Sequence, residues 1–218
     1  FGSFVFGSFV FGSNFTGNRA TGTNASAGSV SVGLAEDCPV VIDDCEFKEN
    51  TAVYKAGAVF VGSYVVTVSN SVFSDDNEAE IGNAIYNGGN LVLNGNTVDS
   101  TGSEIYSSGS GKIDTHEWVI VNNHEDVTVE YYDTIPIVVK ITDDNGNLIR
   151  IDAPTLEIDL GDKWTRKTLT LDESTGFYTM DAYLVDQKSG LLTPSRLTIQ
   201  EYFTSYNANA NLNSSYVT

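Results

Sequence analysis

The chain has 218 residues, of which 41% are hydrophobic and 11% aromatic, enough for a buried core in one large or two ordinary domains. Its 29 Asp and Glu against 11 Lys and Arg give a formal net charge of −18, so the surface would repel a phosphate backbone and nucleic acid is not an expected partner. No apolar run reaches the roughly 18 residues of a transmembrane helix, so we expect no transmembrane segment in this fragment.

The chain opens with a five-residue repeat of Phe, Gly and Ser between Phe1 and Ser13. It starts without Met or a signal-peptide pattern, and we interpret it as a piece of a longer protein. The alternation of large and small residues is typical of strands. We expect these strands to precede the repeats described next, and their free end to need a cap or another subunit, because exposed apolar strand edges promote aggregation.

A longer internal repeat follows. Ala27–Gly33, Ala56–Gly62 and Gly82–Gly88 resemble one another, with a weaker copy at Ser103–Ser107. Each of the first three is followed by a β-rich run and then by an aromatic residue or Val, and the repeats lie about 25 to 32 residues apart. Apolar residues alternate with polar ones, which is the period of a half-buried strand. We therefore predict an all-β fold with a right-handed parallel β-helix (a β-solenoid) over residues 1–114.

In such a fold, equivalent residues of successive repeats stack directly above one another. The predicted interior columns are Phe15/Phe47/Phe73/Val98, Val30/Val59/Ile85/Ile105, Val40/Val66/Leu91 and Ile42/Val68/Leu93.

A polar column is predicted at Asn18, Asn50 and Asp76. Stacked carboxylates and amides could bind calcium or a sugar, but side chains about 4.8 Å apart can also hydrogen-bond to one another and to turn backbone. We favour the structural role and expect no cofactor, with calcium kept as an alternative.

The acidic pairs Asp43–Asp44 and Asp75–Asp76 are the candidates for a polysaccharide lyase or glycosidase, because such enzymes also use parallel β-helices and paired carboxylates. Both pairs fall in predicted turns, where neighbouring side chains diverge. The cations that a lyase needs are scattered over the repeats, and His116 and His124 lack the spacing of a zinc site. We therefore predict that the chain is not an enzyme.

The two cysteines, Cys38 and Cys45, flank a predicted strand that would hold their Cα atoms about 20 Å apart, beyond the reach of a disulfide. We expect unpaired, partly buried thiols. Three Asn-x-Ser/Thr sequons, at Asn14, Asn24 and Asn213, are possible glycosylation sites in a secreted chain.

From about Glu117 the repeat stops, and seven or eight short predicted strands over residues 115–202 favour a β-sandwich. They include Leu148–Ile151, Thr155–Leu160 and Phe177–Tyr183. The Asn-Gly step in Asp143–Asn147 predicts a tight hairpin turn rather than a calcium loop. Residues 203–218, rich in Asn, Ala and Ser, read as a linker or the start of a further module.

The repeats at Asn83–Leu91 and Cys45–Ala52 resemble the β-helix repeats of adhesin-like surface proteins of methanogenic archaea and of bacterial polymorphic outer-surface proteins. The second module, through Ile137–Asn147 and Thr175–Thr179, looks like the immunoglobulin-like domains that follow such repeats. Ser29 and Glu104 depart from the family's small Ala. The resemblance implies an extracellular, cell-surface, non-catalytic adhesin or stalk, whose partners would be glycans or proteins of a host or neighbouring cell.

A self-assembling fibre or cell-wall-layer subunit remains an alternative, since a β-helix with open ends can continue into another copy by end-to-end stacking. Within the adhesin hypothesis, the candidate surface contacts are Tyr54, Tyr64, Tyr86 and Tyr106. Tyr86 and Tyr106 could instead stack with Phe60 in an outward ladder, which is the arrangement we favour.

Overall fold

The computed structural model describes residues 3–5, 9–33, 39–62, 65–74, 76–99, 105–108, 111–113, 117–120, 134–151, 155–159, 164–183, 196–200 and 207–210. These residues form strands and turns without a helix, which confirms the all-β prediction. Accordingly, no helix within them is long and apolar enough to cross a membrane. The chain divides into two compact units, Phe1–Glu117 with Thr142–Asp152, and Trp118–Ile141 with Ala153–Thr218.

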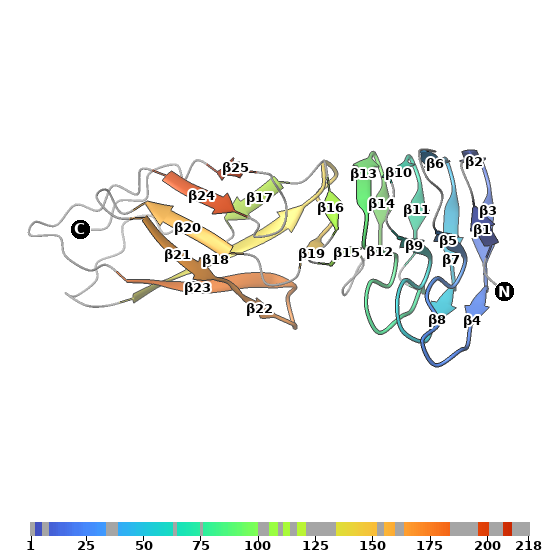
Figure 1. Cartoon of the computed structure of the whole chain (residues 1–218), viewed down its shortest axis with the longest axis horizontal. Helices are drawn as coiled ribbons and strands as arrows, with labels where there is room; N and C mark the ends of the chain where they lie inside the picture. The colour runs from blue at the N-terminus through green and yellow to red at the C-terminus, as the bar shows by residue number, and fades with distance from the viewer. Residues whose placement is uncertain are drawn as a thin grey trace, which may run out of the picture. The chain divides into compact units, whose positions relative to one another are not determined.

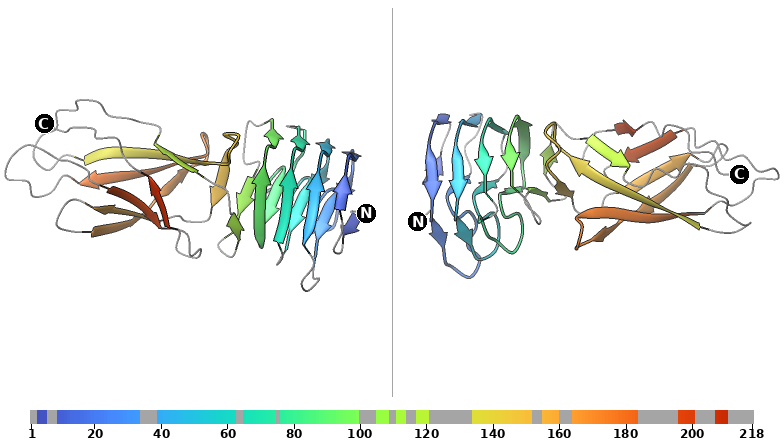
Figure 2. Two further views of the ribbon diagram at one scale, coloured as in Figure 1. Left: turned by 90° about the horizontal axis from the view of Figure 1, so that it is seen from above. Right: turned by 180° about the vertical axis from the view of Figure 1, so that it is seen from behind.

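The first unit, which we call the parallel-sheet unit, is built from three parallel sheets (Figures 1 and 2). Sheet A contains, in spatial order, β1 (Ser3–Val5), β5 (Val30–Val32), β9 (Val59–Val61), β12 (Ile85–Asn87), β15 (Ile105–Ser107) and β19 (Ile149–Ile151). Sheet B contains β16 (Lys112–Ile113), β13 (Asn90–Asn94), β10 (Val65–Ser69), β6 (Val40–Asp43) and β2 (Phe9–Phe11). Sheet C contains β14 (Thr97–Val98), β11 (Val72–Phe73), β7 (Glu46–Lys48) and β3 (Asn14–Thr16), and β4 (Arg19–Ala20) pairs with β8 (Thr51–Ala52).

The register of these sheets confirms the predicted columns. Phe47 lies opposite Phe15 on one side and Phe73 on the other, and the rings stack with centroids 5.0 and 4.7 Å apart. Ile85 likewise lies between Val59 and Ile105. These side chains, apart from the half-buried Phe15, are buried. Because a slip of one residue would turn every one of them outward, burial fixes the register.

The remaining columns follow the same rule. They are Val40/Val66/Leu91, Ile42/Val68/Leu93 and, at the end of the phenylalanine column, Phe73/Val98.

Successive repeats approach closely at two glycines. A Cβ atom at Gly28 would stand 2.7 Å from Thr51 N, and one at Gly57 would stand 2.6 Å from Glu78 N, while each would also clash with a carbonyl oxygen of the next repeat. Real Cβ atoms do not approach backbone this closely, so only glycine fits at these two positions.

One corner of each repeat places a residue in the left-handed region. The φ values are 55° at Gly12, 54° at Asp44, 49° at Asn70 and 62° at Gly95. Gly, Asn and Asp are the residues that adopt this conformation most readily. The corner therefore explains why these residue types recur just after β2, β6, β10 and β13 of sheet B.

The second unit, which we call the antiparallel unit, contains two four-stranded sheets. One orders as β17 (Glu117–Ile120), β18 (Thr134–Thr142), β23 (Phe177–Tyr183) and β22 (Thr170–Asp172); the other orders as β21 (Trp164–Thr168), β20 (Thr155–Asp159), β24 (Arg196–Gln200) and β25 (Asn207–Ala210). Val139, Ile141, Leu169 and Tyr178 are buried. The strand expected near Val127 lies outside the described residues.

Two expectations for the second half need correction. Residues 203–218 are not all linker, because β25 pairs antiparallel with β24. The strand expected over Leu148–Ile151 does not join the second module: Ile149 and Ile151 pair in parallel with Ile105 and Ser107 of sheet A. The predicted turn before it does form, since Thr142 and Leu148 face each other across an antiparallel bridge. Alternating apolar residues specify a strand but not the sheet that it joins.

Candidate binding surface

An aromatic row runs along the outer side of sheet A. Ser31, Phe60, Tyr86 and Tyr106 occupy equivalent positions of β5, β9, β12 and β15. Each of them follows a residue of the buried Val30/Val59/Ile85/Ile105 column in the chain. Since successive strand residues point to opposite faces, this row faces away from the core.

The three aromatic rings of this row form the outward ladder that the sequence predicts. Phe60 and Tyr86 stack with centroids 5.5 Å apart and an interplanar angle of 5°, and Tyr86 and Tyr106 stack at 5.5 Å and 18°. Both faces of the Tyr86 ring are therefore covered by neighbours, and the residue is only 7% exposed. Tyr86 cannot offer its ring face to a sugar. Phe60 and Tyr106, the two end members of the ladder, are half-buried, and Tyr106 lies opposite Arg150 of β19.

Lys55 lies against this ladder. Its Nζ atom donates a hydrogen bond of 2.9 Å to Tyr86 Oη and stands 4.3 Å from the Tyr86 ring centroid and 4.9 Å from that of Tyr54. A cation at such distances is attracted by the ring electrons. Tyr54, Lys55, Phe60, Tyr86 and Tyr106 together form what we call the aromatic surface; Tyr64 lies outside the described residues.

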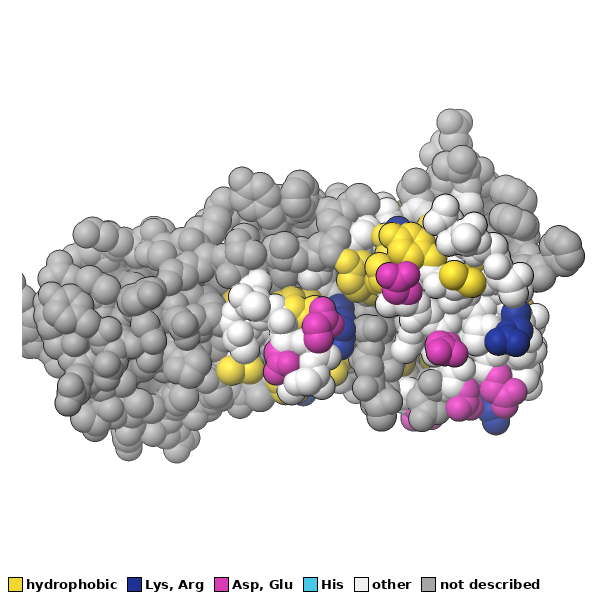
Figure 3. All heavy atoms as spheres, turned by 90° about the horizontal axis from the view of Figure 1, so that it is seen from below, with side chains coloured by type: hydrophobic (Ala, Val, Ile, Leu, Met, Phe, Trp, Pro, Cys, Tyr) yellow, Lys and Arg dark blue, Asp and Glu magenta, His cyan; other side chains and the backbone are white. Residues whose placement is uncertain are grey.

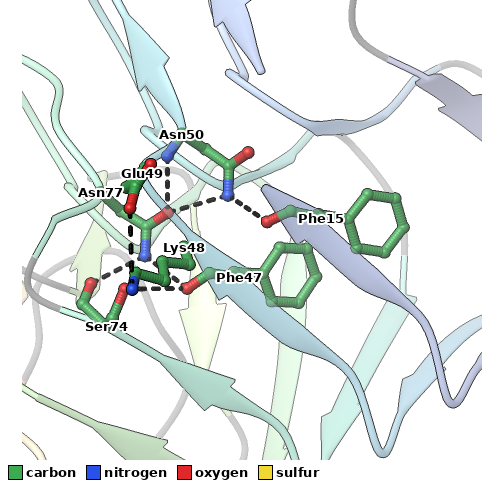
Figure 4. A network of polar contacts seen from close by, with 7 residues as sticks. All are labelled: Phe15, Phe47, Lys48, Glu49, Asn50, Ser74 and Asn77. Atoms are coloured by element: carbon green, nitrogen blue, oxygen red, sulfur yellow. Dashed lines mark hydrogen bonds and ion pairs between the residues drawn. The ribbon is translucent and has the colours of Figure 1, made fainter. Parts of the chain in front are cut away.

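The side-chain amides form a separate ladder at another turn (Figure 4). Asn18 Nδ2 donates to Asn50 Oδ1 at 2.9 Å, and Asn50 Nδ2 donates to Asn77 Oδ1 at 3.0 Å and to Phe15 O at 2.9 Å. The third member is thus Asn77 and not Asp76, whose side chain is exposed. The prediction missed by one residue because a turn, unlike a strand, has no fixed period by which to count.

Asn50 is fully buried. Besides the contacts above, its backbone N–H donates to Asn77 Oδ1, and its own Oδ1 accepts from the Asn18 backbone N–H, both at 3.2 Å. Every polar atom of this amide is engaged within the protein. The ladder therefore stabilises the turns and leaves Asn50 no atom with which to bind a ligand.

The acidic candidates do not converge on a common centre. The Asp43 carboxylate accepts hydrogen bonds from Ser69 Oγ at 2.6 Å and from Asn70 Nδ2 at 2.9 Å. The Ser69 bond, and then the Asn70 bond, hold the pKa of Asp43 below its usual value, the opposite of what a general acid at neutral pH requires. Asp44 and Asp76 are exposed, and Asp75 lies outside the described residues.

Acidic side chains are spread over the face drawn in Figure 3 rather than gathered in one place. Within the described ranges, no three His, Cys, Asp or Glu side chains come together as a metal site would need. His116 and His124 fall outside those ranges. The possible calcium ligand Asp76 takes no part in the amide ladder.

Cys45 is buried and free, as predicted, and Cys38 lies outside the described residues. The Sγ atom of Cys45 donates to the carbonyl oxygens of Asp43 at 3.2 Å and Val10 at 3.6 Å. Burial raises the pKa of this thiol, which keeps it protonated and unreactive.

Two of the three sequon asparagines are accessible. Asn14 and Asn24 are exposed, whereas Asn213 lies outside the described residues. An exposed side-chain amide is required for glycosylation, so the described structure leaves both sites open to modification.

Comparisons of the chain with protein-family models, curated proteins and solved structures gave no match. The aromatic surface therefore has to be judged on its own geometry. Sequence reasoning identified its tyrosines but not the contact of Lys55 with Tyr86. Lys55 and Tyr86 are 31 residues apart in the chain, and only the fold brings the two side chains together.

Proposed function

We propose that the chain is a non-catalytic, extracellular cell-surface protein that acts as an adhesin or as a stalk. In this proposal the parallel-sheet unit is a right-handed parallel β-helix and the antiparallel unit is an immunoglobulin-like β-sandwich. One observation carries the proposal: equivalent residues of successive repeats, such as Phe15, Phe47 and Phe73, pair in register along three parallel sheets. Such an array of repeats suits a protein that acts as a spacer better than one that needs a catalytic cleft.

The mechanism follows from the way repeats stack. Each repeat contacts only its neighbours, so the array behaves as a stiff element whose outer rows are repeated along its length. The aromatic surface supplies an outer row in which Tyr54 and Tyr106 are half-buried and Lys55 lies against the rings of Tyr54 and Tyr86. Edges and hydroxyls of tyrosine can contact a protein or a glycan without deep burial of either partner.

The test is an attachment assay with the purified chain coupled to beads. Beads would be applied to a panel of cells and to a glycan array, and the retained beads counted. We expect retention of wild-type beads on at least one cell type and a loss of most of it with Tyr106→Ala. Phe9→Ala removes an exposed aromatic on sheet B and serves as the matched control. Equal retention of wild-type and uncoated beads on every surface would contradict the proposal.

A second candidate is the self-assembling fibre or wall-layer subunit. It is favoured by Phe9 and Phe11, which are 81% and 67% exposed on β2, the end strand of sheet B. Exposed apolar side chains on an edge strand promote pairing with another chain. A mass that increases with concentration in sedimentation experiments, and that is restored to the monomer value by Phe9→Ser and Phe11→Ser, would support this candidate.

A further inference from the structure

The segment Thr142–Asp152 leaves the antiparallel unit between β18 and β20 and belongs to the parallel-sheet unit. Its strand β19 lies beyond β15 as the last strand of sheet A. Ile149 is fully buried there and continues the Val30/Val59/Ile85/Ile105 column. This segment therefore contributes to sheet A the strand and the buried side chain that a further repeat would contribute.

The same segment also closes the end of sheet C, but with side chains. Between successive repeats, a backbone N–H donates across the turn: Val72 N to Cys45 O, and Thr97 N to Ser71 O. Asn96 O is the next acceptor in this series. It accepts from side-chain amides, Asn145 Nδ2 at 2.7 Å and Asn147 Nδ2 at 2.9 Å.

The side-chain amide of Asn147 takes the place of a backbone peptide group, because it both donates a hydrogen bond to the end of the sheet and accepts one from it. While its Nδ2 donates to Asn96 O, its Oδ1 accepts from the backbone N–H of Val98 at 3.2 Å. Asp144 Oδ2 adds a longer contact to Gly95 N, at 3.4 Å. Backbone groups at the end of a sheet that would otherwise be open to another strand are thus satisfied from within the chain.

Asp143 holds these amides in position. Its Oδ1 atom accepts from the backbone N–H groups of Asn145 and Asn147, at 3.0 and 2.9 Å, and its Oδ2 atom accepts from Asn147 Nδ2 at 2.8 Å. Asp143 is only 2% exposed. The turn is therefore built around a buried carboxylate that orients Asn147 toward the sheet.

We propose that Thr142–Asp152 is an edge cap that prevents a second copy of this chain from pairing with β15 of sheet A and with the end of sheet C. The second copy would dock with its β1–β4 end. That end belongs to the same register as the repeat interfaces inside the unit: Phe15 has the position of Phe73 and Val98, and Ser13 that of Ser71 and Asn96. A contact between unlike ends does not close on itself and would yield filaments.

The experiment uses the full chain with Asn145→Ala and Asn147→Ala together. Sedimentation velocity over a range of concentrations would give the mass, and hydrogen exchange would give the protection of the Val98 amide. We expect the wild type to keep one mass. In the variant, we expect the mass at high concentration to at least double and the Val98 amide to exchange about five times faster or more, because its acceptor is lost.

Asn94→Ala is the matched control, since Asn94 lies one strand earlier in the same repeat with an exposed side chain. It should keep the wild-type mass and the wild-type Val98 exchange. Should the double variant fail to fold, Asn147→Ala alone decides, because it removes the acceptor of the Val98 N–H while the backbone N–H of residue 147 keeps its bond to Asp143 Oδ1. A folded variant with the wild-type mass at every concentration overturns the proposal, as does a wild type that associates as strongly as the variant.

Discussion

Gly57 shows how little room the stacked repeats leave at the scale of one residue. Its Cα approaches the next repeat so closely that a methyl group would meet the Asn83 carbonyl and the Glu78 N–H. Both of those are backbone atoms, which cannot move aside without breaking the sheet pairing around them.

We therefore expect Gly57→Ala to lower the free energy of unfolding by about 3 kcal/mol, as overpacking against backbone does. Chemical denaturation monitored by circular dichroism measures this. Gly33→Ala is the control, because no atom lies within 4 Å of a Cβ there. Equal effects of the two substitutions would show that the close approach at Gly57 is not a constraint.

The carboxyl group of Asp43 makes the stability of the fold depend on pH. Its pKa in the folded chain is lowered, first by the Ser69 hydroxyl and then by Asn70, from the ordinary value of 3.8. A carboxyl with a lowered folded-state pKa stabilises the fold above its unfolded pKa, and that stabilisation is lost as the pH falls through the folded pKa.

Ser69→Ala should therefore raise the pKa of Asp43 in an NMR titration. It should also destabilise the protein more at pH 7 than at a pH below the folded-state pKa of Asp43, where the carboxyl is protonated in both states. Ser74→Ala is the control: Ser74 Oγ donates to the Phe47 carbonyl and to no carboxylate, so its effect should not follow the Asp43 titration. A Ser69→Ala effect of equal size at both pH values would contradict this role.

The sequence predicts individual residues well inside strands and less well inside turns. The interior positions of Phe47 and Phe73 are predicted correctly because every second residue of a strand points to the same face. Asp76 is wrong, and Asn77 takes its place, because a turn residue is placed by local hydrogen bonds such as that from Asn77 Nδ2 to Ser74 O. Such a bond is not visible in the sequence.

At the scale of elements, two ladders join the repeats: the phenylalanine column in the core and the amide ladder at the turn. The amide ladder is the more sensitive, since a buried polar group is costly when its partner is removed. Asn50 is its central member, and its side chain bonds to the repeats on both sides.

Asn50→Ala should lower the free energy of unfolding by about 3 kcal/mol, because it leaves Phe15 O and the Asn18 amide without their partner. Thermal and urea unfolding would measure the loss. The exposed Asn24 provides the control, where replacement by Ala should change stability by less than about 0.5 kcal/mol. A small loss at Asn50 would mean that water replaces its hydrogen bonds.

Elements repeated in the sequence could be predicted, and those that occur once could not. The strands of sheets A, B and C recur with the same alternation in each repeat, so each copy supports the others. β21 and β25 lack this support: the first begins with Trp164 in a polar run and the second is Asn207–Ala210, with low intrinsic strand preference. They are strands because neighbouring strands pair with them.

At the scale of the whole molecule, the chain passes from one unit to the other three times, after Glu117, after Ile141 and after Asp152. A boundary near residue 115 could be predicted from the end of the repeat. The excursion of Thr142–Asp152 could not, because Ile149 alternates with its neighbours in the same way as a strand of either unit.

We expect the excursion to make the stability of each unit depend on the other. Tyr178 is buried in the antiparallel unit, and Tyr178→Ala should destabilise that unit by about 3 kcal/mol. With its flanking strands β18 and β20 loosened, Thr142–Asp152 should also open more often.

Hydrogen exchange would therefore become faster at the Val98 amide, which bonds to Asn147, and stay unchanged at the Val68 amide in the middle of sheet B. Thr170→Ala, at an exposed position of β22, is the control and should leave both amides as they are. Unchanged Val98 exchange in a chain whose antiparallel unit exchanges faster would show that the two units are independent.

Because the array consists of equivalent repeats between the β1–β4 end and the Thr142–Asp152 segment, its length can change without altering either end. Duplicating one internal repeat, from β8 to β11 for example, would move the segment after β15 outward by about one strand spacing, roughly 4.8 Å. The Asn96 and Val98 contacts would be carried along intact. Gene duplication could thus adjust the reach of such a protein in small, equal increments.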